Sequence, residues 1–119
     1  MNRRALGEMG ERWAREYLQD QGYRIRETNF RCRKGEVDIV AQEGDCLVFV
    51  EVRTRSGPGF GTPEESVTAA KQHRLAAVAL SYIQSHRGLP PDWRIDVVAI
   101  EVDRGGQVVR TALIRNAVS

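Results

Sequence analysis

Residues 35–54 read GEVDIVAQEGDCLVFVEVRT, and this stretch decides the fold. Both of its halves are rich in β-branched residues, which favour extended backbone. The short EGD segment between them carries the glycine and aspartate that are typical of tight turns. The stretch therefore predicts two antiparallel strands, over residues 35–42 and 46–54.

The length of this turn determines which side chains face each other across the hairpin. A loop of two or four residues pairs Asp38 with Glu51, Glu36 with Arg53, and Val40 with Phe49. The opposite face then carries only apolar pairs, which are Val37 with Val52, Ile39 with Val50, and Ala41 with Val48. A loop of three residues would mix charge into this apolar layer, so burial favours the first register.

The remainder of the chain predicts two helices and three further strands. The expected elements are a helix over 4–21, a strand over 23–30, a second helix from Thr62 to about Gly88, and strands over 94–102 and 108–115. The second helix is expected to begin at Thr62 because Pro63 and Glu65 follow as a first-turn proline and a capping-box acid. This order predicts an α/β fold of three layers, with a central mixed sheet flanked by helices, in a single domain over 1–119.

Composition indicates a globular protein outside the membrane. Charged residues make up 29% of the 119 residues and hydrophobic residues 41%. The longest apolar run covers residues 75–80, whereas a bilayer-spanning helix needs about 20 apolar residues. No apolar targeting segment stands near the first residues, so a cytoplasmic location is expected.

The central hairpin also carries the chemistry. Directly opposed residues have Cβ atoms about 4.5 to 5.5 Å apart, so Asp38 and Glu51 would place two carboxylates together in mid-sheet. These anions repel, and either a bound divalent cation or the guanidinium of Arg53 would compensate them. The alternative is a charge ladder in which Glu36 and Arg53 pair across the strands.

These residues resemble a known pattern. A carboxylate on one strand followed across a hairpin by Glu-x-Lys is the PD-(D/E)xK nuclease signature, and here it stands as Asp38, then Glu51, Val52 and Arg53. The segments GEVDIVA, LVFVEVRTR, RIDVVAIE and IRNA are similar to those of the YraN family, small bacterial proteins predicted to be endonucleases and similar to archaeal Holliday-junction resolvases. The resemblance implies a restriction-endonuclease-like form of the three-layer fold.

The resemblance also implies an activity and roles for individual residues. It implies hydrolysis of DNA with Mg²⁺ or Mn²⁺, and branched or repair intermediates are the substrates expected of a resolvase relative. Asp38 and Glu51 resemble the metal-binding carboxylates, with the main-chain carbonyl of Val52 as a further ligand. Glu11 resembles the helix carboxylate near the metal in resolvases, although its position equally suits a solvent-facing glutamate. Arg53 departs from the signature, which has Lys there; Arg stays protonated and can act only electrostatically.

Basic residues on both sides of the hairpin are candidates for contacting nucleic acid. They are Arg31, Arg33 and Lys34 before the first strand, Arg55 after the second, and Lys71 with Gln72 on the second helix. The glycine-rich loop over 56–61 could approach phosphates, and its Phe60 suits either stacking on a base or packing.

Two rival functions fit the same residues. One is a non-catalytic nucleic-acid-binding module in which Arg53 pairs with Glu36 and closes the metal site. The other is an adaptor for a different DNA-processing protein. The resolvase resemblance further implies a homodimer, because two strands are then cut symmetrically.

Overall fold

In the part of the chain that the structure describes, five strands form one mixed sheet with an α-helix on each face. The structure is a computed structural model that describes residues 2–57 and 61–117. Its elements are α1 (Arg3–Asp20), β1 (Arg24–Cys32), β2 (Gly35–Glu43), β3 (Cys46–Ser56), the 3-10 helix η1 (Pro63–Ser66), α2 (Ala69–Ser85), β4 (Asp92–Val102) and β5 (Val108–Ile114). The strands lie in the order β1-β2-β3-β4-β5, and only β3 and β4 run parallel.

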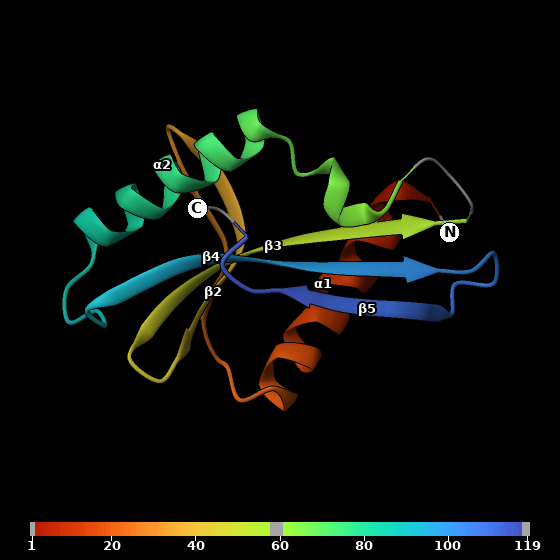
Figure 1. Cartoon of the computed structure of the whole chain (residues 1–119), viewed down its shortest axis with the longest axis horizontal. Coiled ribbons are helices and arrows are strands. Elements are labelled where there is room, and N and C mark those ends of the chain that lie inside the picture. Colours follow the sequence, from red (N-terminus) through yellow and green to blue (C-terminus); the bar gives the residue numbers. More distant parts are fainter. Residues whose placement is uncertain (1, 58–60, 118–119) are drawn as a thin grey trace.

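The two helices lie on opposite faces of the sheet (Figure 1), and an apolar cluster holds each of them there. Ala14 and Leu18 of α1 pack on one face, against a cluster that includes Val50 of β3. Leu75 and Tyr82 belong to the α2 cluster on the other face. The predicted three-layer α/β architecture with a central mixed sheet is therefore confirmed, and it is compatible with a nuclease-like fold. Neither helix in the described ranges has the length and apolar content that crossing a membrane requires.

The β2–β3 hairpin has the register that burial favours. Its turn consists of Gly44 and Asp45, since Glu43 still pairs with Cys46. Gly44 adopts a φ of 57°, a left-handed conformation that glycine tolerates without steric cost. The predicted pairs of Ile39 with Val50, Val40 with Phe49, and Ala41 with Val48 are all present.

Beyond Ile39 and Val50 the pairing of β2 with β3 stops. Val37 packs in the α2 cluster, on the same face as Val40, whereas Ile39 packs in the α1 cluster. The prediction that Val37 and Ile39 lie on the same face of the sheet is therefore wrong. The regular alternation of faces along β2 breaks between these two residues, at Asp38. We call this point, where β2 separates from β3 but stays paired with β1, the fork of the sheet.

The neighbouring strand shows why β2 departs at this point. Asn29 of β1 lies across from Asp38, between the pairs Thr28–Ile39 and Phe30–Val37. Its φ is 54°, in the left-handed region that asparagine enters more readily than most residues. The left-handed conformation of Asn29 coincides with the fork, and β2 remains paired with β1 as far as Gly35.

The prediction of one continuous helix from Thr62 is wrong. Thr62 and Glu65 do form the expected capping box, but it caps only η1. Val67 then leaves helical geometry with a ψ of 84° and is buried in the core. Thr68 provides a second N-cap by accepting a hydrogen bond from the Lys71 N–H at 3.3 Å, and α2 starts at the next residue.

A buried carboxylate joins segments that are distant in the sequence. Asp96 of β4 is fully buried and accepts hydrogen bonds from the Tyr23 hydroxyl, Arg94 Nε and the Asn116 N–H at 2.9 to 3.0 Å. Burial, together with the hydrogen bond to Asp96, raises the pKa of Tyr23 to about 12. These bonds fix the beginning of β1 and the segment after β5 to the central sheet.

We expect Gly10→Ala to destabilise the protein by about 1 to 3 kcal/mol, because a Cβ there overpacks the contact of α1 with β3. That Cβ would lie 1.9 Å from Thr54 Oγ1 and 3.0 Å from Thr54 Cβ. Urea unfolding measures the change. Gly7→Ala is the matched control in the same helix, since nothing lies within 4 Å of its Cβ, and it should stabilise by up to about 1 kcal/mol. Equal effects of the two substitutions would contradict the close packing.

Candidate functional site

Asp38 fills the gap that the fork opens. Because β2 no longer pairs with β3 here, the Val52 N–H has no partner in the β2 main chain, and the Asp38 Oδ2 accepts its hydrogen bond at 2.8 Å. A buried N–H without a partner would be costly, so this bond holds the carboxylate in place. The N–H and C=O of one strand residue point to the same edge, so the Val52 carbonyl also faces the fork.

Glu51 lies beside Asp38 and is mostly buried, with 15% of its side chain exposed. Burial is the largest cause that raises its pKa, and the hydrogen bond and negative charge of Asp38 add to it. The positive charges of Arg53 and Lys71 act in the opposite direction, and the pKa of Glu51 still rises to about 8. The two carboxyl groups are thus brought together, and positive charge compensates them incompletely. They do not meet as the directly opposed strand pair that the sequence predicted, because the pairing of β2 with β3 ends at Ile39 and Val50.

Arg53 is held between Glu51 and η1. Its Nε donates to Ser66 Oγ at 2.8 Å, and its NH1 lies 3.6 Å from Glu51 Oε2. Ser66 in turn donates to the Pro63 carbonyl at 2.5 Å. No sequence pattern pointed to Ser66, because the helix was expected to run on through that residue.

The charge ladder between Glu36 and Arg53 is not formed. Glu36 instead pairs with Arg31 across the β1–β2 hairpin, at 2.9 Å. The physical reason is the fork, which carries Glu36 away from β3 together with the end of β2 that pairs with β1. The prediction that Arg53 pairs with Glu36 and so closes the metal site is therefore wrong.

Glu11 shares a cavity with Asp38. This α1 cavity has a volume of about 420 Å³ between α1 and β3, and it is lined by Arg3, Arg4, Leu6, Gly7, Glu8, Glu11, Asp38, Val52, Arg53 and Thr54. Asn29 Nδ2 donates to Glu11 Oε1 at 2.9 Å, and Arg15 lies 3.6 Å from the same oxygen. Glu11 is thus fixed by side chains of α1 and β1. Sequence reasoning missed Arg3 and Arg4, whose only signal is two adjacent arginines at the start of a helix.

Glu51 opens toward a smaller cavity on the α2 face. This cavity of about 210 Å³ is also lined by Gly35, Glu36, Lys71, Arg74 and Leu75. Lys71 is thereby brought close enough to Glu51 for its charge to act on the carboxyl group. Gln72 has a structural contact instead, because its Nε2 donates to the Val67 carbonyl at 3.2 Å and supports the junction of η1 with α2.

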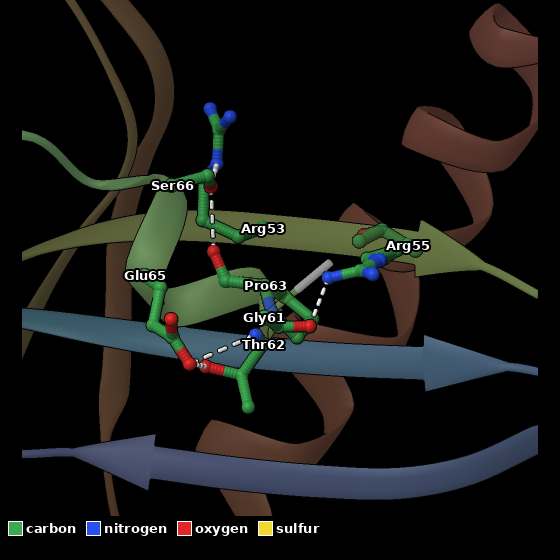
Figure 2. Close-up of a pocket in the computed structure, with 8 residues that line it drawn as sticks. Arg53, Arg55, Gly61, Thr62, Pro63, Glu65 and Ser66 are labelled. Carbon is green, nitrogen blue, oxygen red and sulfur yellow. Dashed lines mark hydrogen bonds between the residues drawn. The ribbon is translucent and has the colours of Figure 1, made fainter. Parts of the chain in front are cut away.

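A third cavity, the η1 cavity, lies between β3 and η1 (Figure 2). Its volume is about 480 Å³, and it is lined by Arg53, Thr54, Arg55, Gly61, Thr62, Pro63, Glu65 and Ser66. In Figure 2 the Arg53 side chain runs to Ser66, whereas the Arg55 side chain turns toward Gly61, whose carbonyl accepts a hydrogen bond from Arg55 NH1. Phe60, the candidate for base stacking, lies outside the described residues.

The basic turn between β1 and β2 lies beside α2, away from the carboxyl end of β3 (Figure 1). None of its three basic residues, Arg31, Arg33 and Lys34, lines the three cavities described above. The structure therefore does not bring this turn together with Arg55. Their proposed contacts with nucleic acid remain predictions.

The donor set at the fork is small. Within residues 2–57 and 61–117, no group of three or more His, Cys, Asp or Glu side chains is arranged to hold a metal ion. What the fork offers is two carboxylates, Asp38 and Glu51, and the carbonyl of Val52. Hard oxygen donors of this kind suit Mg²⁺, which commonly binds one or two carboxylates and retains water ligands.

We expect the protein to lose stability as the pH rises through the raised pKa of Glu51. An ordinary glutamate ionises near pH 4.5, whereas folded Glu51 keeps its proton to about pH 8. The unfolded chain therefore binds fewer protons than the folded one between these values, and stability falls as pH increases. In metal-free buffer, Glu51→Gln should stabilise the protein at pH 9 by about 2 to 4 kcal/mol and have little effect at pH 4, since one pKa unit corresponds to about 1.4 kcal/mol.

Thermal unfolding of both proteins at the two pH values measures this difference. Glu16→Gln, the same substitution on an exposed part of α1, is the matched control and should give equal changes at both pH values. A Glu51→Gln effect that does not depend on pH would contradict the raised pKa.

The comparisons with known proteins agree with the sequence pattern. The profile of the uncharacterised protein family UPF0102 matches residues 10–100. A UPF0102 protein of Symbiobacterium thermophilum is 51% identical over 114 residues, which cover 96% of each chain. A UPF0102 protein of Chloroflexus aurantiacus is 50% identical over 109 residues, covering 90% of this chain and 87% of the relative.

Among solved structures, the chain is similar to Pyrococcus furiosus SfsA in complex with Ca²⁺, with a TM-score of 0.38 and 11% identity over 89% of this chain and 61% of that one. A likeness this weak carries no argument about fold or function. The family assignment rests on the sequence matches, which extend over nearly the whole chain. The chain belongs to the uncharacterised protein family UPF0102, which is the YraN family that the hairpin residues resemble.

Proposed function

We propose that this protein is a divalent-metal-dependent endonuclease that hydrolyses phosphodiester bonds in DNA, with branched or repair intermediates as its substrate class. The observation that carries the proposal is the meeting of Asp38 and Glu51 at the fork of the sheet, beside the main chain of Val52. Perturbed carboxyl pairs of this kind are concentrated at functional sites.

The electrostatics of the pair support a metal ligand role. Glu51 retains a proton to about pH 8, first because it is buried and second because Asp38 lies beside it, and the nearby positive charges offset these effects only in part. A divalent cation would replace that proton and allow both groups to ionise. When bound, Mg²⁺ or Mn²⁺ would supply Lewis-acid stabilisation of the phosphate. Asp38, Glu51 and the Val52 carbonyl are the proposed ligands.

Arg53 is proposed to stabilise negative charge on the phosphate. A guanidinium remains protonated in proteins, so Arg53 acts as a fixed positive charge and not as a base. The hydrogen bond from its Nε to Ser66 Oγ restrains the side chain and leaves its NH1 side near Glu51. This restraint reduces the motion that an arginine would otherwise have to lose on binding.

Glu11 is proposed to act as a third acidic group of the site, beside Asp38 on the α1 cavity. Asn29 and Arg15 orient its carboxylate, and Asp38 lines the same cavity. In this arrangement Glu11 would orient water close to the metal ligands. Only part of its side chain, 20%, is exposed, so it is not a freely solvated helix residue.

One contact favours a second candidate function, a non-catalytic nucleic-acid-binding module. Arg53 NH1 lies 3.6 Å from Glu51 Oε2 and compensates part of the charge of that carboxyl group without any metal. Such a module, or an adaptor for another DNA-processing protein, would bind DNA in a salt-sensitive manner and would be indifferent to Mg²⁺. Its binding would survive Asp38→Ala.

We expect purified protein to cleave labelled DNA in Mn²⁺ or Mg²⁺, and Asp38→Asn or Glu51→Gln to reduce cleavage by at least about 100-fold, since even residues behind metal ligands contribute about 10- to 100-fold. Both substitutions keep the shape of the side chain, and the amide oxygen of the asparagine can still accept the Val52 hydrogen bond. Linear, single-stranded and four-way-junction substrates rank the preferred structure. Arg53→Lys tests whether the lysine of the general signature increases the rate.

Glu16→Gln, prepared identically, is the control and should cleave like the wild type. If the Asp38 and Glu51 variants cleave DNA as fast as the wild type, the activity comes from a contaminating nuclease or from a different site. Binding by every variant with cleavage by none would favour the non-catalytic module.

A further inference from the structure

The α1 cavity and the η1 cavity adjoin the same part of β3. Arg53 and Thr54 line both of them, so the two cavities lie against one short stretch of a single strand. Thr54 is also in close contact with α1, because a Cβ on Gly10 would clash with it. The carboxyl-terminal half of β3 is therefore bordered by an open space toward α1 and another toward η1.

Arginines line both spaces. Arg3 and Arg4 belong to the α1 cavity, and Arg55 with Arg53 belongs to the η1 cavity. The acidic residues there also have partners. Glu65 accepts a hydrogen bond from the Thr62 N–H, Glu11 from Asn29 and Asp38 from the Val52 N–H, and Glu8 pairs with Arg4. Arg4 is 90% exposed and pairs with Glu8 at 3.4 Å, an exposed contact of the weak kind that a stronger anion can replace.

Apart from the weak pair of Arg4 with Glu8, the position of Arg3 and Arg4 is unfavourable for the helix. They stand in the first turn of α1, which contains no acidic residue. The helix dipole places partial positive charge at that end, so cations there are unfavourable for helix stability. Two adjacent arginines at this place therefore suit the binding of an anion better than the support of the fold.

The wall of the η1 cavity is fixed before any ligand binds. Arg110 of β5 holds Glu64 of η1 through two hydrogen bonds, at 3.0 and 2.6 Å, and also contacts Glu101 at 3.1 Å. The hydrogen bonds from Arg110 lower the pKa of Glu64 to about 2, so this pair stays ionised at neutral pH. Pro63 is buried beneath the same turn. A ligand would meet a preformed surface.

We infer that a nucleic-acid backbone crosses β3 at Thr54, with Arg3 and Arg4 binding a phosphate on one side and Arg55 binding a phosphate on the other. Guanidinium groups form bidentate hydrogen bonds with phosphate oxygens, which suits this role. The path passes Asp38 through the α1 cavity, and it leaves the basic β1–β2 turn aside. The choice of a nucleic acid as the ligand rests on the proposed function.

The test is DNA binding without hydrolysis, measured by fluorescence anisotropy of labelled single-stranded and duplex DNA in EDTA. Arg3→Gln/Arg4→Gln and, separately, Arg55→Gln should each weaken binding by about 10-fold and lower the slope of log K against log salt by about 1 for each phosphate that is no longer neutralised. The control is Arg24→Gln/Arg87→Gln, which removes the same charge as the first variant from exposed arginines elsewhere on the surface and should change binding less than about 2-fold.

Three results would each overturn the path. The control variant could lose as much DNA affinity as the test variants, Arg31→Gln/Arg33→Gln could lose more, or the wild type could fail to bind DNA. Arg55→Lys retains the charge and should recover most of the affinity that Arg55→Gln loses; failure to recover, with unchanged thermal unfolding, would also count against Arg55 as a phosphate ligand. If no protein cleaves DNA but the Arg3, Arg4 and Arg55 variants bind it weakly, the nuclease is rejected and the path retained. If the wild type cleaves DNA but these variants bind it no more weakly than the control variant does, the path is rejected and the nuclease retained.

Discussion

At the fork of the sheet, one side-chain hydrogen bond replaces a strand pairing. The Val52 N–H donates to the Asp38 carboxylate at 2.8 Å, just beyond the last main-chain pair of β2 with β3. This bond lets the two strands separate without leaving a buried donor unpaired, which would cost about 1 to 3 kcal/mol. It also places Asp38 beside Glu51, so the separation of the strands and the pairing of the acids have the same cause.

The surrounding elements each hold one member of the site. Asn29 of β1 adopts a left-handed conformation across from Asp38 and donates to Glu11. Ser66 of η1 accepts from Arg53 and thereby connects the site to the segment that precedes α2. Ionisation of the acid pair is unfavourable, because burial and the neighbouring Asp38 both raise the pKa of Glu51. Local rules of strand pairing and charge are thus broken at the place where a function is proposed.

The sequence was sufficient for the parts of the fold that follow from local patterns. The Gly44 turn determined the hairpin register, and apolar spacing predicted both helical layers. The position of Val37 could not be predicted, because GEVDIV alternates regularly and only the conformation of Asn29 in another strand accompanies the break.

Other features depended on contacts between distant segments. The break between η1 and α2 arises because Val67 turns into the core, and Thr68 then caps α2, whereas the sequence pattern indicated a cap at Thr62 alone. Glu36 pairs with Arg31 and not with Arg53, because at the fork the end of β2 that carries Glu36 leaves β3 and stays beside β1. The role of Asp96 could not be predicted from its place in an apolar strand. It depends on three partners, which are Tyr23, Arg94 and the segment after β5.

The parallel pairing of β3 with β4 has a consequence for how the chain folds. Its partners, such as Cys46 with Asp92, are farther apart in the sequence than those of the antiparallel pairs. Distant contacts form late, because loop closure must precede them. We therefore expect the β1–β2–β3 meander to assemble first and the crossover through η1 and α2 to dock afterwards. Asp38 and Glu51 would then meet before Ser66 arrives to restrain Arg53, so the acidic half of the site would be built earlier than its cationic half.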